Sequence, residues 1–223
     1  MPRTARIAPG GIVFHVLNRA NARAQVFARS QDYVAFERVL CETARAVPIR
    51  ILAYVVMPNH WHLVLCPERD GELAAFIHRL ATTHVRRWHL HRQTVGLGHL
   101  YQGTYKSFPV QEDEHLLVVL RYVERNPVRA KLVKRAEDWR WSSLWRRLHP
   151  EAAEGRLALC AWPVEGPRNW LDFVNTCEPQ HQLDTLRAST TKGRPFGDGT
   201  WQWRTAKALG LESAFRPRGR PRT

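Results

Sequence analysis

The sequence has few cysteines and no closely spaced pair of them. The four that occur, Cys41, Cys66, Cys160 and Cys177, lie far apart among the 223 residues, without a Cys-x-x-Cys motif. This spacing supports neither the disulfide framework of a small secreted domain nor a zinc ribbon. We expect reduced thiols that lie in the core.

Long apolar runs are also missing. No stretch approaches the ~20 apolar residues of a membrane helix. Residues 1–10 lack the apolar segment and cleavage site of a secretory signal. A hydrophobic content of 44% with nine tryptophans excludes a wholly disordered chain. These features predict a soluble, cytoplasmic protein without a membrane partner.

Acidic residues are scarce relative to basic ones. The chain has 34 Lys and Arg against 20 Asp and Glu, a net charge of +14. The net charge is +5 for residues 1–120, +6 for 121–147, −4 for 148–186 and +7 for 187–223. A generally basic, solubilising surface would not predict the acidic stretch between two basic blocks. The pattern favours a nucleic-acid partner, and therefore a nucleoid-associated protein.

Apolar periodicity and turn residues predict the order of the secondary structure elements. Ser30 is the expected N-cap of the first helix, and Met57-Pro58-Asn59 reads as the turn of a hairpin. The expected elements are a strand at 11–19, a helix at 30–47, strands at 49–56 and 61–66, a helix at 72–91, a strand at 104–110 and a helix from about 112 that ends before Pro127.

The order β-α-β-β-α-β predicts an α+β fold of the ferredoxin-like, split βαβ type. We expect an antiparallel sheet with helices on one face, and a small, helical, basic C-terminal extension. Residues 1–147 would form the main domain, 148–182 a proline-containing, acidic connecting region, and 183–223 the extension. Asp198 or Thr200 is the expected cap of a helix in that extension.

The segment His60-Trp61-His62 is the first candidate for chemistry. Side chains alternate faces along a strand, so His60 and His62 project to the same side. Two neutral imidazoles can bind a divalent metal ion and leave positions open for a phosphate oxygen. The alternative is two partly exposed histidines without a ligand, which is common in strands.

The helix that ends before Pro127 carries the second candidate. Tyr122 and Asn126 are four residues apart and share one helical face. Tyrosine is a weak nucleophile at neutral pH, because a phenol ordinarily titrates near pH 10. A nearby metal ion and arginines would assist it. The alternative is an ordinary, half-buried helix tyrosine.

Two motifs together resemble those of a known family. Met57-Pro58-Asn59-His60-Trp61-His62 and the Arg-Tyr-x-x-x-Asn-Pro-x-Arg-Ala segment at 121–130 are similar to the single-tyrosine HUH transposases, over roughly residues 11–147. Within that superfamily they resemble most the REP-associated tyrosine transposases. The segment at 187–210 resembles the C-terminal extension of this subfamily.

The resemblance implies DNA transposition by a tyrosine nucleophile, with residues 1–147 as the catalytic domain. Tyr122 would attack single-stranded, hairpin-forming DNA of repetitive extragenic palindromes and form a 5′-phosphotyrosine link. His60 and His62 would bind Mg²⁺ or Mn²⁺, with Asn126 as a further ligand. Recombination would follow when the link is reversed onto another DNA end.

Basic and polar residues near these motifs are candidate DNA contacts, whereas His15 is interpreted as structural. The tail at 216–222 resembles an AT-hook, although a charged tail without that role is an alternative. The candidate contacts are Asn18, Arg19, Arg23, Lys106, Arg121, Arg125, Arg129, Lys192, Arg194, Arg218 and Arg220.

Two other functions compete with the transposase. A binding protein of the same fold, such as a regulator or a domesticated transposase, could recognise palindromic DNA without cutting it. An RNA-binding ferredoxin-like module is disfavoured, because the aromatic motifs of an RNA-recognition sheet are missing. The sequence leaves the choice between monomer and homodimer open.

Overall fold

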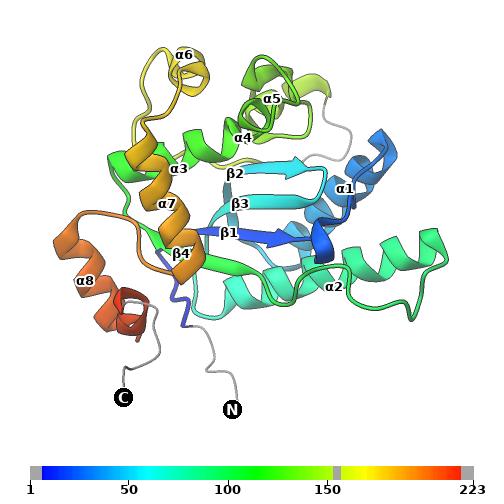
Figure 1. Cartoon of the computed structure of the whole chain (residues 1–223), viewed down its shortest axis with the longest axis horizontal. Helices are drawn as coiled ribbons and strands as arrows, with labels where there is room; N and C mark the ends of the chain where they lie inside the picture. Colours follow the sequence, from blue (N-terminus) through cyan, green and yellow to red (C-terminus); the bar gives the residue numbers. More distant parts are fainter. Residues whose placement is uncertain (1–6, 153–156, 217–223) are drawn as a thin grey trace.

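In the computed structural model, which describes residues 7–152 and 157–216, four strands form one antiparallel sheet in the order β4-β1-β3-β2 (Figure 1). The strands are β1 (Val13–Arg19), β2 (Arg50–Met57), β3 (His60–Cys66) and β4 (Lys106–Val110). Strands β2 and β3 form the expected hairpin, in which Met57 pairs with His60 across Pro58 and Asn59. The central strand β1 pairs with β3 and β4.

Helices α1 (Ser30–Ala46) and α2 (Glu72–Arg92) cover one face of this sheet. Their apolar stripes bury Phe36 and Phe76 against Phe14 and Trp61, and none of the four side chains is more than 3% exposed. The ferredoxin-like prediction is therefore confirmed.

The prediction that Ser30 is the N-cap of α1 was wrong. Ser30 is the first helical residue, and the Asp32 carboxylate accepts hydrogen bonds from the backbone N–H groups of Ala28 and Arg29. An ionised carboxylate accepts these bonds more strongly than a hydroxyl oxygen.

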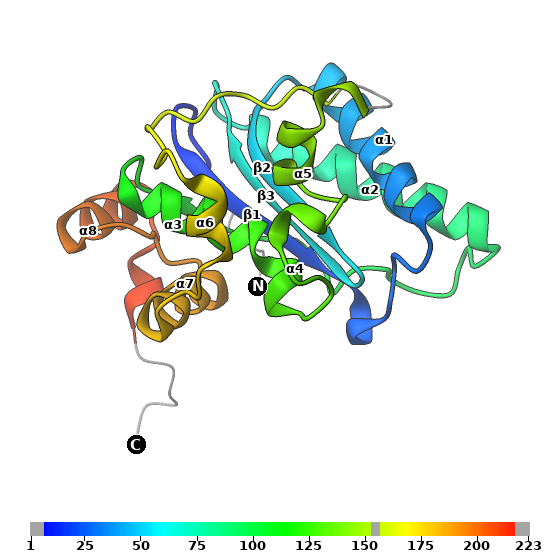
Figure 2. The same ribbon diagram turned by 90° about the horizontal axis from the view of Figure 1, so that it is seen from above.

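Helices cover the second face of the sheet as well, contrary to the expectation of helices on one face only (Figure 2). Helix α3 (Glu114–Glu124) packs there against Val55, Val64 and Phe108. Both faces of the strands carry fully buried apolar side chains, so an uncovered face would expose a large apolar surface to water.

Helix α3 ends before Pro127, as expected. The next short helix, α4 (Asn126–Arg129), continues the chain in nearly the same path, because the N–H groups of Arg129 and Ala130 donate to the carbonyls of Arg125 and Asn126. Proline is tolerated in the first turn of a helix, where its missing N–H needs no partner.

Further helices lie in the remaining described residues. They are η2 (Ala136–Asp138), α5 (Ser143–Leu148), η3 (Pro150–Ala152), α6 (Trp170–Asn175), α7 (Gln180–Lys192), α8 (Gly199–Ala208) and η4 (Glu212–Phe215), in addition to η1 (Asn21–Arg23) after β1.

The C-terminal segment packs against the main sheet. Leu186 and Phe196 lie in the same apolar cluster as Val110 of β4, and the Phe196 N–H donates to the Pro109 carbonyl. The predicted helix cap is confirmed, because the Asp198 carboxylate accepts from the Trp201 N–H. The arginine-rich tail with Arg218 and Arg220 lies outside the described residues.

All four cysteines have free thiols. Cys41 and Cys66 are buried as expected, but Cys177 is exposed in the loop before α7, so the core prediction was wrong for it. Within the described ranges, every helix is too short or too polar to cross a bilayer.

Candidate active site

Strand β3 places His60 and His62 on the face of the sheet that α3 covers. The two ring centroids are 5.0 Å apart, and the residues are only 9% and 3% exposed. The predicted convergence of the two imidazoles follows from the strand alternation, because both side chains point away from the face that buries Trp61.

Helix α3 brings Tyr122 to these histidines. Its ring is half-buried and lies edge-on to the His62 ring, with 5.8 Å between centroids. Residues 60 positions apart in sequence thus meet where α3 crosses the sheet.

A third histidine, which sequence reasoning treated as structural, belongs to the same cluster. His15 of β1 is fully buried, and its Nε2 lies 2.8 Å from Nδ1 of His62. In the β1–β3 register His15 pairs with Val64, so His62 is its diagonal neighbour on the same face. Alternation gave the face of each histidine, but only the register shows that they touch.

Burial keeps the histidines neutral. Burial, together with the nearby positive charges of Arg19 and Arg129, lowers the pKa of His60 to about 3. The pKa of His62 is also held well below its usual value, chiefly by burial. A neutral imidazole has a free lone pair, which is the form that binds a metal ion.

The hydrogen bonds of the two rings also fit a metal site. Nδ1 of His60 lies 2.6 Å from Oδ1 of Asn59, and Nδ1 of His62 contacts His15. Within the described part of the chain, no hydrogen bond is recorded to Nε2 of either ring. Both rings can therefore offer Nε2 to an ion.

Asn126 is 7% exposed at the start of α4, one turn beyond Tyr122, and its role as a ligand remains a prediction.

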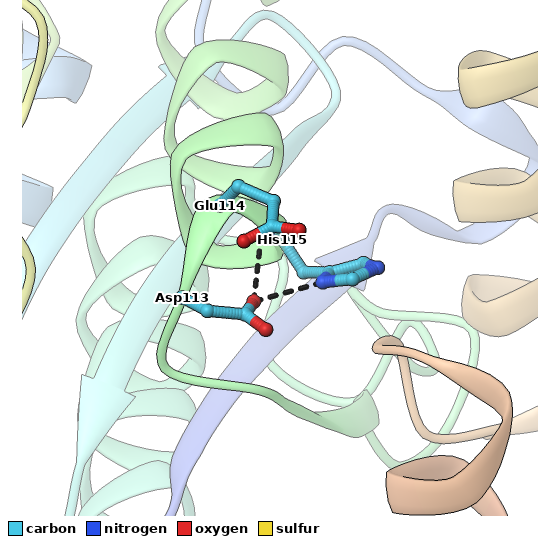
Figure 3. A group of neighbouring side chains, drawn as sticks. All are labelled: Asp113, Glu114 and His115. Carbon is cyan, nitrogen blue, oxygen red and sulfur yellow. Dashed lines mark hydrogen bonds and ion pairs between the residues drawn. The ribbon is translucent and has the colours of Figure 1, made fainter.

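A separate group that could hold a metal ion lies at the opposite end of α3. Asp113, Glu114 and His115 lie together there, and the Asp113 carboxylate accepts from both the N–H and Nδ1 of His115 (Figure 3). Asp113 is thus already used as the N-cap of α3. Sequence reasoning did not single out this group.

Arg121 of α3, Arg125 at its C-cap and Arg129 of α4 all contact the end of α6 or the loop between α6 and α7. Arg121 donates to the Thr176 carbonyl, Arg125 to the Asn175 carbonyl, and Arg129 to the Glu178 carboxylate. Arg125 also pairs with Glu178. DNA contact by these arginines remains a prediction, and the phosphates would compete with these internal bonds.

Two other predicted DNA contacts meet in a surface cavity. Lys106 of β4 and Lys192 of α7 line a cavity of about 440 Å³, together with the hydroxyl-bearing Thr190 and Thr191. The two lysines, 86 positions apart in the sequence, therefore bring positive charge to the same cavity.

The remaining predicted contacts are dispersed. Asn18 lines a second cavity of about 560 Å³ beside Arg86 of α2, and Arg23 is exposed in η1. Arg194 donates to Gln202 and lies over the Phe215 ring, so it stabilises the packing of the C-terminal helices.

The family model described as "Transposase IS200 like" matches residues 10–126. A REP-associated tyrosine transposase of Escherichia coli (strain K12) is 24% identical over 165 residues, which cover 74% of this chain and 89% of the relative. A putative REP-associated tyrosine transposase of Haemophilus influenzae is 27% identical, covering 54% of this chain and 73% of the relative.

Among solved structures, one described as the REP-associated tyrosine transposase bound to a REP hairpin matches with a TM-score of 0.54. It is 22% identical and covers 71% of this chain and 92% of its own. At that identity the match supports the fold. The resemblance to REP-associated transposases that the sequence motifs indicate is confirmed by these comparisons.

Proposed function

The chain belongs to the IS200-like transposase family, and from this premise we propose that it cuts and rejoins hairpin-forming single-stranded DNA with Tyr122. The observation that carries the proposal is the contact of Tyr122 with His62, which itself neighbours His60. A nucleophile and two neutral metal-binding imidazoles lie within one small site.

Tyr122 acts as the nucleophile in an in-line displacement. Its phenol oxygen forms a bond to the phosphorus while the bond to the 3′ oxygen breaks, and the phenol proton is lost as the 3′ oxygen gains one. The 5′ end is left on Tyr122. Attack by the 3′-OH of another end reverses the step and restores the phosphodiester.

His60 and His62, with Asn126 as the candidate third ligand, would hold Mg²⁺ or Mn²⁺, which when bound supplies Lewis-acid polarisation of the phosphate. Arg19 adds positive charge beside His60, and its buried Nε has no hydrogen-bond acceptor among the described residues. A phosphate oxygen would satisfy that donor.

The proposed substrate is a hairpin of the repetitive extragenic palindrome type, since the related solved transposase is bound to a REP hairpin. We assign catalysis to residues 1–147, a connecting role to 148–182, and added DNA affinity to the basic extension at 183–223. A DNA-binding role for the extension is supported by Lys192, which lines one cavity together with Lys106 of the catalytic part.

The proposal is tested by detecting a covalent adduct between the protein and DNA. Hairpin-forming single-stranded DNA of the repetitive extragenic palindrome type, incubated with the protein and Mn²⁺, should give a complex that survives denaturant. Tyr122→Phe should remove it, whereas Tyr105→Phe, at another half-buried tyrosine, should keep it. Hairpin binding without any adduct would favour the non-catalytic binding protein instead.

A further inference from the structure

We propose that His15 is a positioning residue: its Nε2 accepts the Nδ1 proton of His62 and thereby leaves Nε2 of His62 free to bind a divalent metal ion. The inference rests on the proposed metal role of His60 and His62, and it assigns a function to a histidine outside the motifs that indicated the site.

The geometry of the pair is that of a direct, water-free hydrogen bond. Nε2 of His15 lies 2.8 Å from Nδ1 of His62, and the two rings are within 14° of parallel. The residues are 0% and 3% exposed, so solvent does not compete for either nitrogen.

A neutral imidazole carries one proton, so this contact can hold only one shared proton. If His15 donates it, the proton of His62 sits on Nε2 and blocks that atom. If His62 donates it, Nε2 of His62 carries a lone pair. Only the second arrangement allows His62 to act as a ligand, and His15 must then be the acceptor.

Nδ1 of His60, like Nδ1 of His62, has a hydrogen-bond partner, which in this case is a side-chain amide oxygen. The Asn59 amide nitrogen donates to the Arg23 carbonyl, which directs Oδ1 of Asn59 toward Nδ1 of His60. This oxygen can only accept, so the His60 proton is placed on Nδ1. His15 provides for His62 the acceptor that Asn59 provides for His60.

The surroundings of His15 argue against a purely structural role. Its own Nδ1 has no hydrogen-bond partner among the described residues. The ring packs against the Phe108 ring, with 4.9 Å between the two ring centroids. A buried polar atom without a partner destabilises the fold, and an apolar residue would fill the space without that cost. Among residues 7–152 and 157–216, the one hydrogen-bond partner of the His15 side chain is His62.

The test measures Mn²⁺ affinity of the full-length protein without DNA, from the electron paramagnetic resonance signal of free Mn²⁺. All proteins carry Glu114→Gln and His115→Gln, which remove the other candidate metal group. Loss of a residue that orients a metal ligand typically weakens affinity about 10- to 100-fold, and we expect this for His15→Phe. The amide oxygen of Gln can accept the same proton. The Mn²⁺ affinity of His15→Gln should therefore stay within about threefold of that of the parent, which carries only Glu114→Gln and His115→Gln.

His84→Phe is the matched control, because His84 is also buried and hydrogen-bonded, to Tyr101 on the opposite face of the sheet. It should leave Mn²⁺ affinity unchanged. Unchanged affinity in a folded His15→Phe protein would overturn the proposal, as would equal losses in His15→Phe and His15→Gln. If His60→Ala does not weaken Mn²⁺ binding, the metal role of the two strand histidines fails, and this inference fails with it.

Ring ¹⁵N spectra test the inference without a variant of His15. In the Mg²⁺-loaded parent protein, His62 should be protonated on Nδ1. A proton on Nε2 of His62 in that state would overturn the proposal.

Discussion

The guanidinium group of Arg129 lies 4.1 Å from the centre of the Tyr122 ring, and it is held there by the Glu178 carboxylate. Glu178 also pairs with Arg125, and its side chain is only 6% exposed. The segment between α6 and α7 thus fixes a positive charge beside the proposed nucleophile.

Glu178→Ala should lower the free energy of unfolding by about 3 kcal/mol, because it leaves two largely buried arginines without their carboxylate. Cleavage at saturating DNA should fall about tenfold, since Arg129 is no longer held over Tyr122. Urea denaturation and adduct kinetics measure the two effects. Glu165→Ala, at an exposed carboxylate of the connecting region, is the control and should change stability by less than about 0.5 kcal/mol.

His60→Ala and His62→Ala should each abolish adduct formation while hairpin affinity stays within about fivefold, because the proposed role of both residues is to hold a metal rather than to bind DNA. His78→Ala, at an exposed histidine of α2, should cleave normally. Gel assays of adduct and binding give both values. Full cleavage by metal-stripped protein in EDTA would contradict a metal role.

Stability should fall as the pH is lowered from 7 to 5. Burial lowers the pKa of His84 to about 3, whereas an unfolded histidine titrates near pH 6.5. Below pH 6.5 the unfolded chain binds a proton that the folded chain excludes, so stability is lost until the pH nears 3. For one such histidine the loss between pH 7 and 5 is about 2 kcal/mol.

His84→Gln should therefore lose about 2 kcal/mol less than the wild type over this interval, as measured by urea denaturation at both pH values. His78→Gln, at the exposed position, should behave as the wild type. Equal pH dependence of His84→Gln and the wild type would mean that His84 is not held neutral in the folded protein.

The basic C-terminal segment is best tested by charge removal. Truncation after Gln182 would also remove Leu186 and Phe196 from the core, so a loss of activity would be ambiguous. The variant replaces the exposed side chains of Arg187, Lys192, Arg204 and Lys207 by glutamine.

This variant should flatten the dependence of log K on log salt by roughly 2 to 3 units, at about 0.7 for each lost phosphate contact. Adduct formation at saturating DNA should persist. Arg38→Gln with Arg45→Gln on α1 is the control, and fluorescence titration at several salt concentrations is the measurement. An unchanged slope would show that the segment does not bind DNA.

The order of the elements and the faces of the site residues follow from local patterns in the sequence. Alternation in β3 placed His60 and His62 on one side, and Pro127 set the end of α3 after Tyr122. These features are local: they depend on backbone periodicity and on the restricted conformation of proline and the residue before it.

Which of these residues meet depends on the way the whole chain folds. The contact of His15 with His62 depends on the β1–β3 register, and the hold of Glu178 on Arg129 depends on the path of the chain after α6. The cover of the second sheet face by α3 and α7 was also not predicted. The contacts His15–His62 and Arg129–Glu178 join residues that are 47 and 49 positions apart in the sequence. They form because the chain folds so that its apolar faces are buried together, and short-range sequence patterns do not specify that arrangement.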